Sequence, residues 1–273
     1  MQDPSKPIWF DKKEIKHTEL QPKKVAIFVA TPVHSTVSIH YTQAVLEFQK
    51  QCMKNNILVM FQLMKSSLVT QGRNLCVSGF MESDSTHLLF IDSDIDFNFS
   101  SIFKMIQSDK DVISVPYPLK TMVWDKAWNK IKSGEIKNVT DLEKKGFYTY
   151  PMKVDNDTDI KIKDGIIEVT HSPTGCMLIK REVLEKMIRA YPNTEIIQNT
   201  IINGELMKRP FLYNLFDTWY DPKTKTYTGE DFAFCKKWKD IGGKCHAIIT
   251  ERITHVGEHQ YRGCFGDELI KTK

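Results

Sequence analysis

The chain has 273 residues, 41% hydrophobic and 26% charged, a composition typical of an ordinary soluble globular protein with one large α/β domain or a domain with an added lobe. Its net charge of +4 does not indicate nucleic-acid binding, although it suits an anionic ligand. The apolar runs fall far short of the roughly 20 residues that span a bilayer, so we expect no membrane insertion and a cytoplasmic protein. The six cysteines form no CxxC pair and are interpreted as reduced thiols.

Residues 1–23 are predicted to be an N-terminal extension, because three prolines interrupt any regular pattern. The next residues, "KKVAIFVATP", contain a continuous apolar run from Val25 to Ala30, which predicts a buried strand. Apolar spacing then predicts helices over 40–55, 69–83 and 100–108, alternating with strands over 57–64, 87–92 and 111–118.

Strands that alternate with helices predict βαβ units and a mainly parallel sheet. In such folds ligands bind beyond the carboxyl ends of the strands. The pattern loosens after Lys120, and 121–165 is interpreted as surface excursions or a small lobe. Further on, we expect two strands and a helix in 165–188, a helix in 228–243 that stops at two glycines, and a final strand with a histidine-bearing loop in 244–263.

Three aspartates, Asp92, Asp94 and Asp96, follow the apolar strand "HLLFI". Carboxylates this close repel one another and raise one another's pKa unless a positive charge lies between them. A divalent cation that bridges to phosphate oxygens would meet that need, through Asp92 and Asp94 or through the alternative pair Asp94 and Asp96. The simpler alternative is a helix N-cap, for which Asp96 or Ser100 would serve.

An ordered series of motifs then resembles a known superfamily: "IFVATP", "QGRN", "HLLFIDSDIDF", "PYPLK", "PTGCMLIKREV", "YTGEDFAFCKKWKDIGG" and "THVGEHQYRG". The chain resembles the GT-A fold nucleotide-sugar glycosyltransferases, and most closely the small single-domain enzymes of large DNA viruses and tailed phages. The resemblance implies one Rossmann-like domain over 24–267, with a nucleotide-binding half (24–120) and an acceptor-binding half (121–267). It is consistent with a virus-encoded enzyme that acts in the host cytoplasm.

The resemblance also implies residues for the donor. The first strand's end would hold the nucleoside, Arg73 and Lys120 would neutralise the diphosphate, and a small-residue turn would lie against the donor sugar. The positions that it implies for donor binding are Thr31, Pro32, Val33, His34, Arg73, Asp92, Ser93, Asp94, Lys120, Thr174 and Gly175. An ordinary βα turn, surface cations and a glycine required by packing are the structural alternatives.

The implied metal ligands are Asp92, Asp94 and His255, with His259 less favoured because it lies further into a glycine-containing loop. An imidazole ligand favours Mn²⁺ over Mg²⁺, which prefers oxygen ligands.

The motif "TGED" implies catalytic carboxylates at the start of a helix. Asp231 would remove the acceptor proton, and Glu230 would bind the sugar or the acceptor. The alternative is that both residues complement the helix dipole.

The resemblance therefore implies a metal-dependent transferase that moves a sugar from a nucleoside-diphosphate sugar, with UDP favoured because the superfamily most often uses it, to a glycan or glycoprotein acceptor. Two other classes stay open. "FIDSDID" could be the nucleophile motif of a haloacid-dehalogenase-like phosphatase, although Ile95 stands where that motif has Thr or Val. The chain could also be a non-catalytic module that binds nucleotide sugars without turnover.

Overall fold

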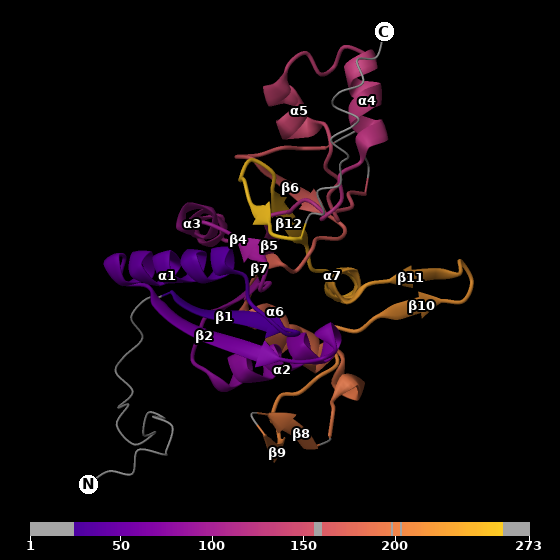
Figure 1. Ribbon diagram of the computed structural model, residues 1–273. Helices are drawn as coiled ribbons and strands as arrows, with labels where there is room; N and C mark the ends of the chain where they lie inside the picture. Colours follow the sequence, from indigo (N-terminus) through magenta and orange to yellow (C-terminus); the bar gives the residue numbers. More distant parts are fainter. Residues whose placement is uncertain (1–24, 156–159, 198, 203, 259–273) are drawn as a thin grey trace.

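A seven-stranded sheet lies at the centre of the molecule (Figure 1). The structure is a computed structural model that describes residues 25–155, 160–197, 199–202 and 204–258, so the extension 1–23, His259 and the rest of the predicted domain up to 267 lie outside the described residues. The sheet strands are β1 (Ala26–Val33), β2 (Leu58–Lys65), β3 (His87–Ile91), β5 (Val112–Ser114), β6 (Ile166–Val169), β7 (Cys176–Lys180) and β12 (Cys245–Ile248).

The strands run in the order β2-β1-β3-β7-β5-β12-β6. Strands β1, β2, β3, β5 and β12 point the same way, while β7 is antiparallel to both of its neighbours and β6 is antiparallel to β12. This confirms the predicted α/β class with a mainly parallel, Rossmann-like sheet. The carboxyl ends of β1, β3, β5 and β12 therefore meet at one edge, where ligands are expected.

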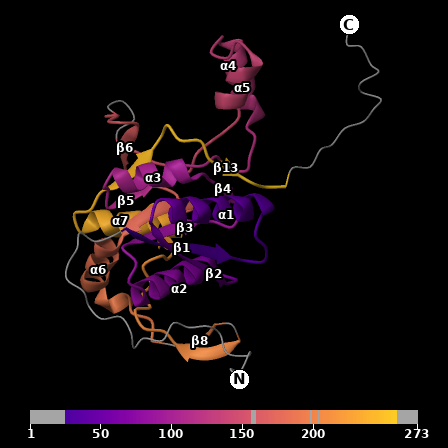
Figure 2. The ribbon, with the colours of Figure 1, turned by 90° about the vertical axis from the view of Figure 1, so that its left-hand side faces the viewer.

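Helices cover both faces of the sheet (Figures 1 and 2). Alternate residues of β1 enter two separate cores: Ile27 and Val29 pack with α1 and α3, while Phe28 packs with α2, α6 and α7. The alternation follows from the two-residue period of a strand whose two faces are both buried. The helices are α1 (Ile39–Lys54), α2 (Val69–Glu82), α3 (Phe99–Gln107), α4 (Trp124–Lys132), α5 (Val139–Lys145), α6 (Arg181–Ala190) and α7 (Glu230–Asp240).

Side-chain caps fix where two of these helices begin. The Ser38 hydroxyl accepts a hydrogen bond from the Tyr41 amide at 3.1 Å at the start of α1. Asn98 does the same for the Ser101 amide at the start of α3, so Asn98, rather than Asp96 or Ser100, is the N-cap. Asp96 instead lies in the short strand β4 (Ile95–Asp96), which pairs antiparallel with β13 (Thr254–His255).

The structure corrects several expectations about the elements. Strand β1 continues beyond Ala30 to Val33, because β2 goes on pairing with it after β3 has stopped. The two strands predicted in 165–188 form, but β6 pairs with β12 and not with β7. Helices α4 and α5 form within 121–165 and stand away from the sheet in both views (Figures 1 and 2). Hairpins and a turn that were not predicted are β8 (Asn199–Ile202) with β9 (Glu205–Lys208), β10 (Trp219–Asp221) with β11 (Thr226–Thr228), and the 3₁₀ turn Pro192–Thr194.

Within the described residues, no helix is both long and apolar enough to cross a bilayer. The five cysteines in that part of the chain are buried free thiols, as expected from their spacing: Cys52, Cys76, Cys176, Cys235 and Cys245.

Candidate active site

Asp92 follows β3 directly, and its position is fixed from the neighbouring strand. Its amide donates to the carbonyl of Gly175 at 3.0 Å. Its two carboxylate oxygens lie 3.0 and 3.2 Å from Nη2 of Arg73. The first carboxylate of the aspartate motif is therefore held by a guanidinium.

Arg73, in α2, is almost completely buried, with 3% of its side chain exposed. Besides contacting Asp92, its Nε donates to Glu230 at 3.1 Å, and the guanidinium lies 5.3 Å from the centre of the Phe90 ring. Burial opposes a charge here, but Asp92 and then Glu230 outweigh it and raise the pKa of Arg73. Arg73 thus links the aspartate motif to the "TGED" motif through a buried ionic bridge.

This geometry changes the role expected of Arg73. Two of its nitrogens are engaged by carboxylates, and Nη1 is buried without a hydrogen-bond partner in the described structure. This position suits Arg73 to stabilising the carboxylates of the two acidic motifs rather than to binding a diphosphate.

Asp94 has different surroundings. It contacts the ammonium of Lys120, and one carboxylate oxygen lies 3.5 Å from Nε2 of His255. The pairing of β4 with β13, reinforced by the Val256 amide donating to the Asp94 carbonyl at 2.8 Å, brings His255 to this place. Burial alone would raise the pKa of Asp94, but contacts with His255 and then Lys120 lower it to about 2. The second carboxylate therefore lies among cationic partners near the surface.

The ring orientation of His255 is set by a hydrogen bond between its Nδ1 and the carbonyl of Pro118 at 2.9 Å. A carbonyl only accepts, so Nδ1 donates this hydrogen bond and Nε2 is the ring atom that faces Asp94. Two electron-rich atoms facing each other require a cation between them or a proton on Nε2. A backbone carbonyl behind a histidine is also a common way of orienting a metal ligand.

The fit of a divalent cation rests on this pair. The ammonium of Lys120 contacts the Asp94 carboxylate and so occupies a place where a positive charge is favourable. Asp92, however, is bound to Arg73, and no group of three or more His, Cys, Asp or Glu side chains within the described ranges is spaced to hold a metal. Of the three predicted metal ligands, Asp94 and His255 are the two that the structure brings together, 3.5 Å apart.

Asp96 lies opposite Thr254 in the pairing of β4 with β13, and the alternative pair Asp94 and Asp96 stays a prediction.

The acidic motif begins α7, with Gly229 as its N-cap residue. Glu230 is the residue that binds Arg73, whereas the half-buried Asp231 accepts a hydrogen bond from the Phe232 amide at 2.8 Å. Burial, and then the negative charge of Glu230, raise the pKa of Asp231 to about 6. Asp231 is thus a stronger base than an ordinary aspartate.

The predicted nucleoside segment is only partly exposed. The hydroxyl of Thr31 is buried and shares a 2.6 Å hydrogen bond with the Tyr41 hydroxyl. Pro32 and Val33 lie within β1 and are half-buried, while His34 is exposed just after it. Beyond this segment, the amide of Ser38, the N-cap residue of α1, donates to the carbonyl of Ser93 at 2.8 Å.

Tyr117 is a site residue that the sequence interpretation missed. Its ring contacts His255 edge to face, with 4.8 Å between the ring centres. A Cβ at Gly175 would lie 2.5 Å from Cε1 of Tyr117, so the glycine is needed for the ring to fit. Burial of the Tyr117 hydroxyl and, to a smaller extent, the negative charge of Asp92 raise the pKa of Tyr117. The available signal was an aromatic residue between two prolines, Pro116 and Pro118, beyond a strand's carboxyl end.

Thr174, the predicted donor-binding residue beside Gly175, is fully buried.

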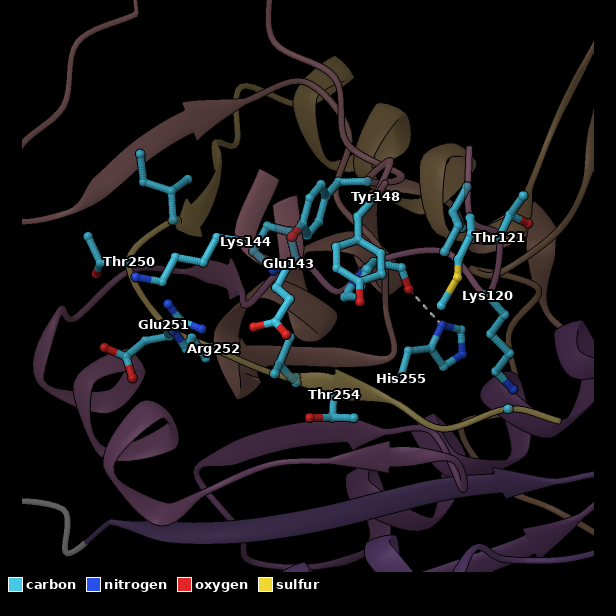
Figure 3. A pocket seen from close by; sticks show the side chains of 18 of the residues that line it. Lys120, Thr121, Glu143, Lys144, Tyr148, Thr250, Glu251, Arg252, Thr254 and His255 are labelled. Carbon is cyan, nitrogen blue, oxygen red and sulfur yellow. Dashed lines mark hydrogen bonds between the residues drawn. The ribbon is translucent and has the colours of Figure 1, made fainter. Parts of the chain in front are cut away.

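A cavity of about 870 Å³ opens beside these residues (Figure 3). Its walls come from 116–124, from 143–150 and from 249–258. Lys120 and His255 line it, so it adjoins the Asp94 cluster. Arg73, Asp92 and Asp231 do not line it. The cavity and the buried acidic network are therefore neighbouring, separate features.

No protein-family model and no curated protein matches the chain. Among solved structures, the chain is similar to A197 from STIV, with 18% identity, a TM-score of 0.42 and coverage of 88% of this chain and 98% of that one. A glycosyltransferase involved in glycosylation of the major capsid of PBCV-1 shares 12% identity at a TM-score of 0.32, covering 62% of this chain and 67% of that one. For 4-diphosphocytidyl-2C-methyl-D-erythritolsynthase from Anaerococcus prevotii the values are 9% identity, a TM-score of 0.31, and coverage of 63% and 79%.

Proposed function

We propose that the protein is a metal-dependent glycosyltransferase that uses a nucleoside-diphosphate sugar, with UDP as the favoured nucleotide. The observation that carries the proposal is the facing pair of Asp94 and the Nε2 atom of His255, 3.5 Å apart at the carboxyl edge of the sheet. The buried network of Arg73, Asp92 and Glu230 lies at the same edge of the sheet. Asp94 and His255 would hold Mn²⁺ or Mg²⁺, which when bound offsets charge on the diphosphate leaving group.

Lys120 supplies the second positive charge for the donor. Its side chain is 40% exposed and its stem crosses Gly257, where a Cβ would lie 2.7 Å from its Cδ. A cation bound at Asp94 would free the ammonium of Lys120, which can then contact a phosphate oxygen. The donor sugar would lie towards Gly175 and Tyr117.

Asp231 acts as the base on the acceptor hydroxyl in a transfer that inverts configuration. Its pKa of about 6 leaves it ionised at neutral pH, yet basic enough to accept a proton as the bond forms. Glu230 cannot take this role in the observed geometry, because Arg73 engages its carboxylate at 3.1 Å.

The geometry also bears on the phosphatase alternative. In that mechanism Asp92 would be the nucleophile, but both of its oxygens lie within 3.2 Å of Arg73. An aspartate bound in this way by a buried guanidinium is a poor nucleophile, which supports the transferase.

The proposal is tested by incubating the full chain with UDP- and GDP-sugars, with Mn²⁺ or with EDTA, and measuring release of the nucleoside diphosphate. We expect release from one donor class, only with the metal and not with Asp94→Asn. Nucleotide binding without release under any condition would indicate a binding module instead. Phosphate release from an aryl phosphate would indicate the phosphatase.

A further inference from the structure

One wall of the cavity beside His255 is aromatic. Trp124, Tyr148 and Tyr150 line it, and Trp124 is 63% exposed. The Trp124 ring is held from behind by Phe147, edge to face, with 4.7 Å between the ring centres. Large aromatic side chains that stay exposed in a concave site offer flat apolar faces to a ligand.

This wall is fixed by backbone hydrogen bonds before any ligand arrives. The Leu119 amide donates to the carbonyl of Thr149 at 2.9 Å, and the Val123 amide donates to that of Phe147 at 3.1 Å. Lys126, from α4, donates to the Tyr148 carbonyl at 2.5 Å. Together these bonds tie the segment before α4 to the segment after α5, so a ligand would find the aromatic faces already in place.

The opposite wall is polar and comes from the segment between β12 and β13. Figure 3 shows Thr250, Arg252 and Thr254 on this side, across from Tyr148. Hydroxyl and guanidinium groups can bond to the hydroxyls of a ligand. Glu251 is already engaged by the Ser101 hydroxyl at 2.7 Å and by Lys104.

The charges along the cavity balance. They are Lys120, Lys144 and Arg252 on the positive side and Glu143, Glu251 and Glu258 on the negative side. With no excess of either sign, the cavity has nothing to offset the charge of a phosphorylated or sulfated ligand. Flat apolar faces opposite hydroxyl-binding groups suit a neutral sugar chain, whose rings have apolar faces and polar edges.

We propose that this cavity binds the acceptor as an uncharged saccharide chain, with a sugar ring stacked on Trp124 and one end of the chain near His255. The proposal rests on the glycosyltransferase function and adds the chemical class of its acceptor. Since Lys120 and His255 belong both to the cavity and to the Asp94 cluster, a chain in the cavity ends beside the donor site. Its terminal sugar would extend beyond the cavity to bring a hydroxyl to Asp231, which does not line the cavity.

The test is binding of the full-length chain to an array of neutral glucan, mannan, galactan and chitin oligosaccharides, with heparin-derived hexasaccharides as anionic probes and no donor present. Each hit is then measured by calorimetry. We expect a neutral chain to bind, with affinity at least tenfold lower in Trp124→Ala. Trp128→Ala is the matched control, because Trp128 lies on the same helix, is 56% exposed and does not line the cavity.

Tyr150→Ser serves as a second variant in case Trp124→Ala disturbs α4, and it too should weaken binding. Binding of heparin alone, of no array member, or equally well to wild type and both cavity variants would overturn the proposal. Donor turnover separates the two claims. Oligosaccharide binding without any donor release would leave the cavity assignment standing while the transferase fails, and donor release without oligosaccharide binding would do the reverse.

Discussion

Two carboxylates of one motif, Asp92 and Asp94, lie two positions apart in different electrostatic regions. Asp92 belongs to a buried network in which Arg73 joins it to Glu230. Asp94 belongs to a half-exposed cluster with Lys120 and His255. The difference teaches that a strand-end DxD need not act as a pair. Here Asp92 is paired with a buried guanidinium and Asp94 with a half-exposed ammonium and an imidazole, and we propose that only Asp94 takes up the cation.

Breaking the buried region should have the largest effect on the molecule. Arg73→Met leaves Asp92 and Glu230 without their shared counter-charge, and removing one partner of a buried ion pair costs about 3–5 kcal/mol. We expect that loss in the free energy of unfolding, measured with urea. Lys244→Met is the control, because its pair with Glu168 lies at the surface, with 66% and 48% of the two side chains exposed, and should contribute about 1 kcal/mol or less. Equal losses in the two variants would contradict the buried bridge.

Asp231→Asn should lower kcat/KM by about 10²–10⁴-fold, the usual contribution of a general base. Wild-type kcat/KM should rise with pH through about 6, as Asp231 loses its proton beside Glu230 and Arg73. The variant should lack this rise. Asp240→Asn, in an exposed pair with Lys236 at the other end of α7, should behave as wild type.

The same variant has a stability signature. The folded-state pKa of Asp231, about 6, lies above the ordinary aspartate value of 3.8, so ionisation of this carboxyl disfavours the folded wild type. Wild type therefore loses stability relative to Asp231→Asn as pH rises from about 4 to 6, and the gap persists above that range. A gap that instead grows towards acid pH would show that the carboxylate is stabilised by its surroundings.

Gly175→Ala should lower the free energy of unfolding by about 1–3 kcal/mol, because the new Cβ would lie 2.5 Å from the Tyr117 ring and overpack the contact between them. Gly79→Ala is a matched control in α2. There the Cβ meets only the end of the flexible Gln62 side chain, at 2.7 Å, and alanine favours a helix. Thermal unfolding should separate the two variants, and similar melting temperatures would place Tyr117 elsewhere.

Lys120→Met should have the smallest effect on stability, about 1 kcal/mol or less, because its pair with Asp94 is 40% and 34% exposed. The variant should bind Mn²⁺ more tightly than wild type, since the ammonium no longer competes for Asp94. Calorimetry with Mn²⁺ in the absence of nucleotide measures this. Weaker Mn²⁺ binding would show that Lys120 supports the cation rather than replaces it.

The parts of the structure that were predictable follow from local pattern. Apolar runs ending in polar residues predicted β3 and β5, and the rule that ligands lie at carboxyl ends drew attention to the aspartate motif after β3. His255 was named from the family resemblance, and its place in β13 opposite β4 was not predicted.

The parts that were not predictable depend on contacts distant in sequence. Nothing near Arg73 indicates that Glu230 will lie 3.1 Å from it, or that Tyr41 will take the hydroxyl of Thr31. The end of β1 was misplaced because β2 extends it, which no residue of β1 reveals. Helices α4 and α5 were missed because their segment is rich in Lys, Asp and Asn, with few residues buried against the sheet.

The most direct test of the account is a Mn²⁺ titration by electron paramagnetic resonance in the presence of UDP, with wild type, Asp94→Asn and Asp96→Asn, all checked for folding. The account predicts that wild type and Asp96→Asn bind the ion equally. Asp94→Asn should bind it about tenfold more weakly or worse, since even a residue that only supports a metal ligand is worth roughly 10–100-fold. Wild-type affinity in Asp94→Asn, or a loss confined to Asp96→Asn, would contradict the assignment of the cation to Asp94.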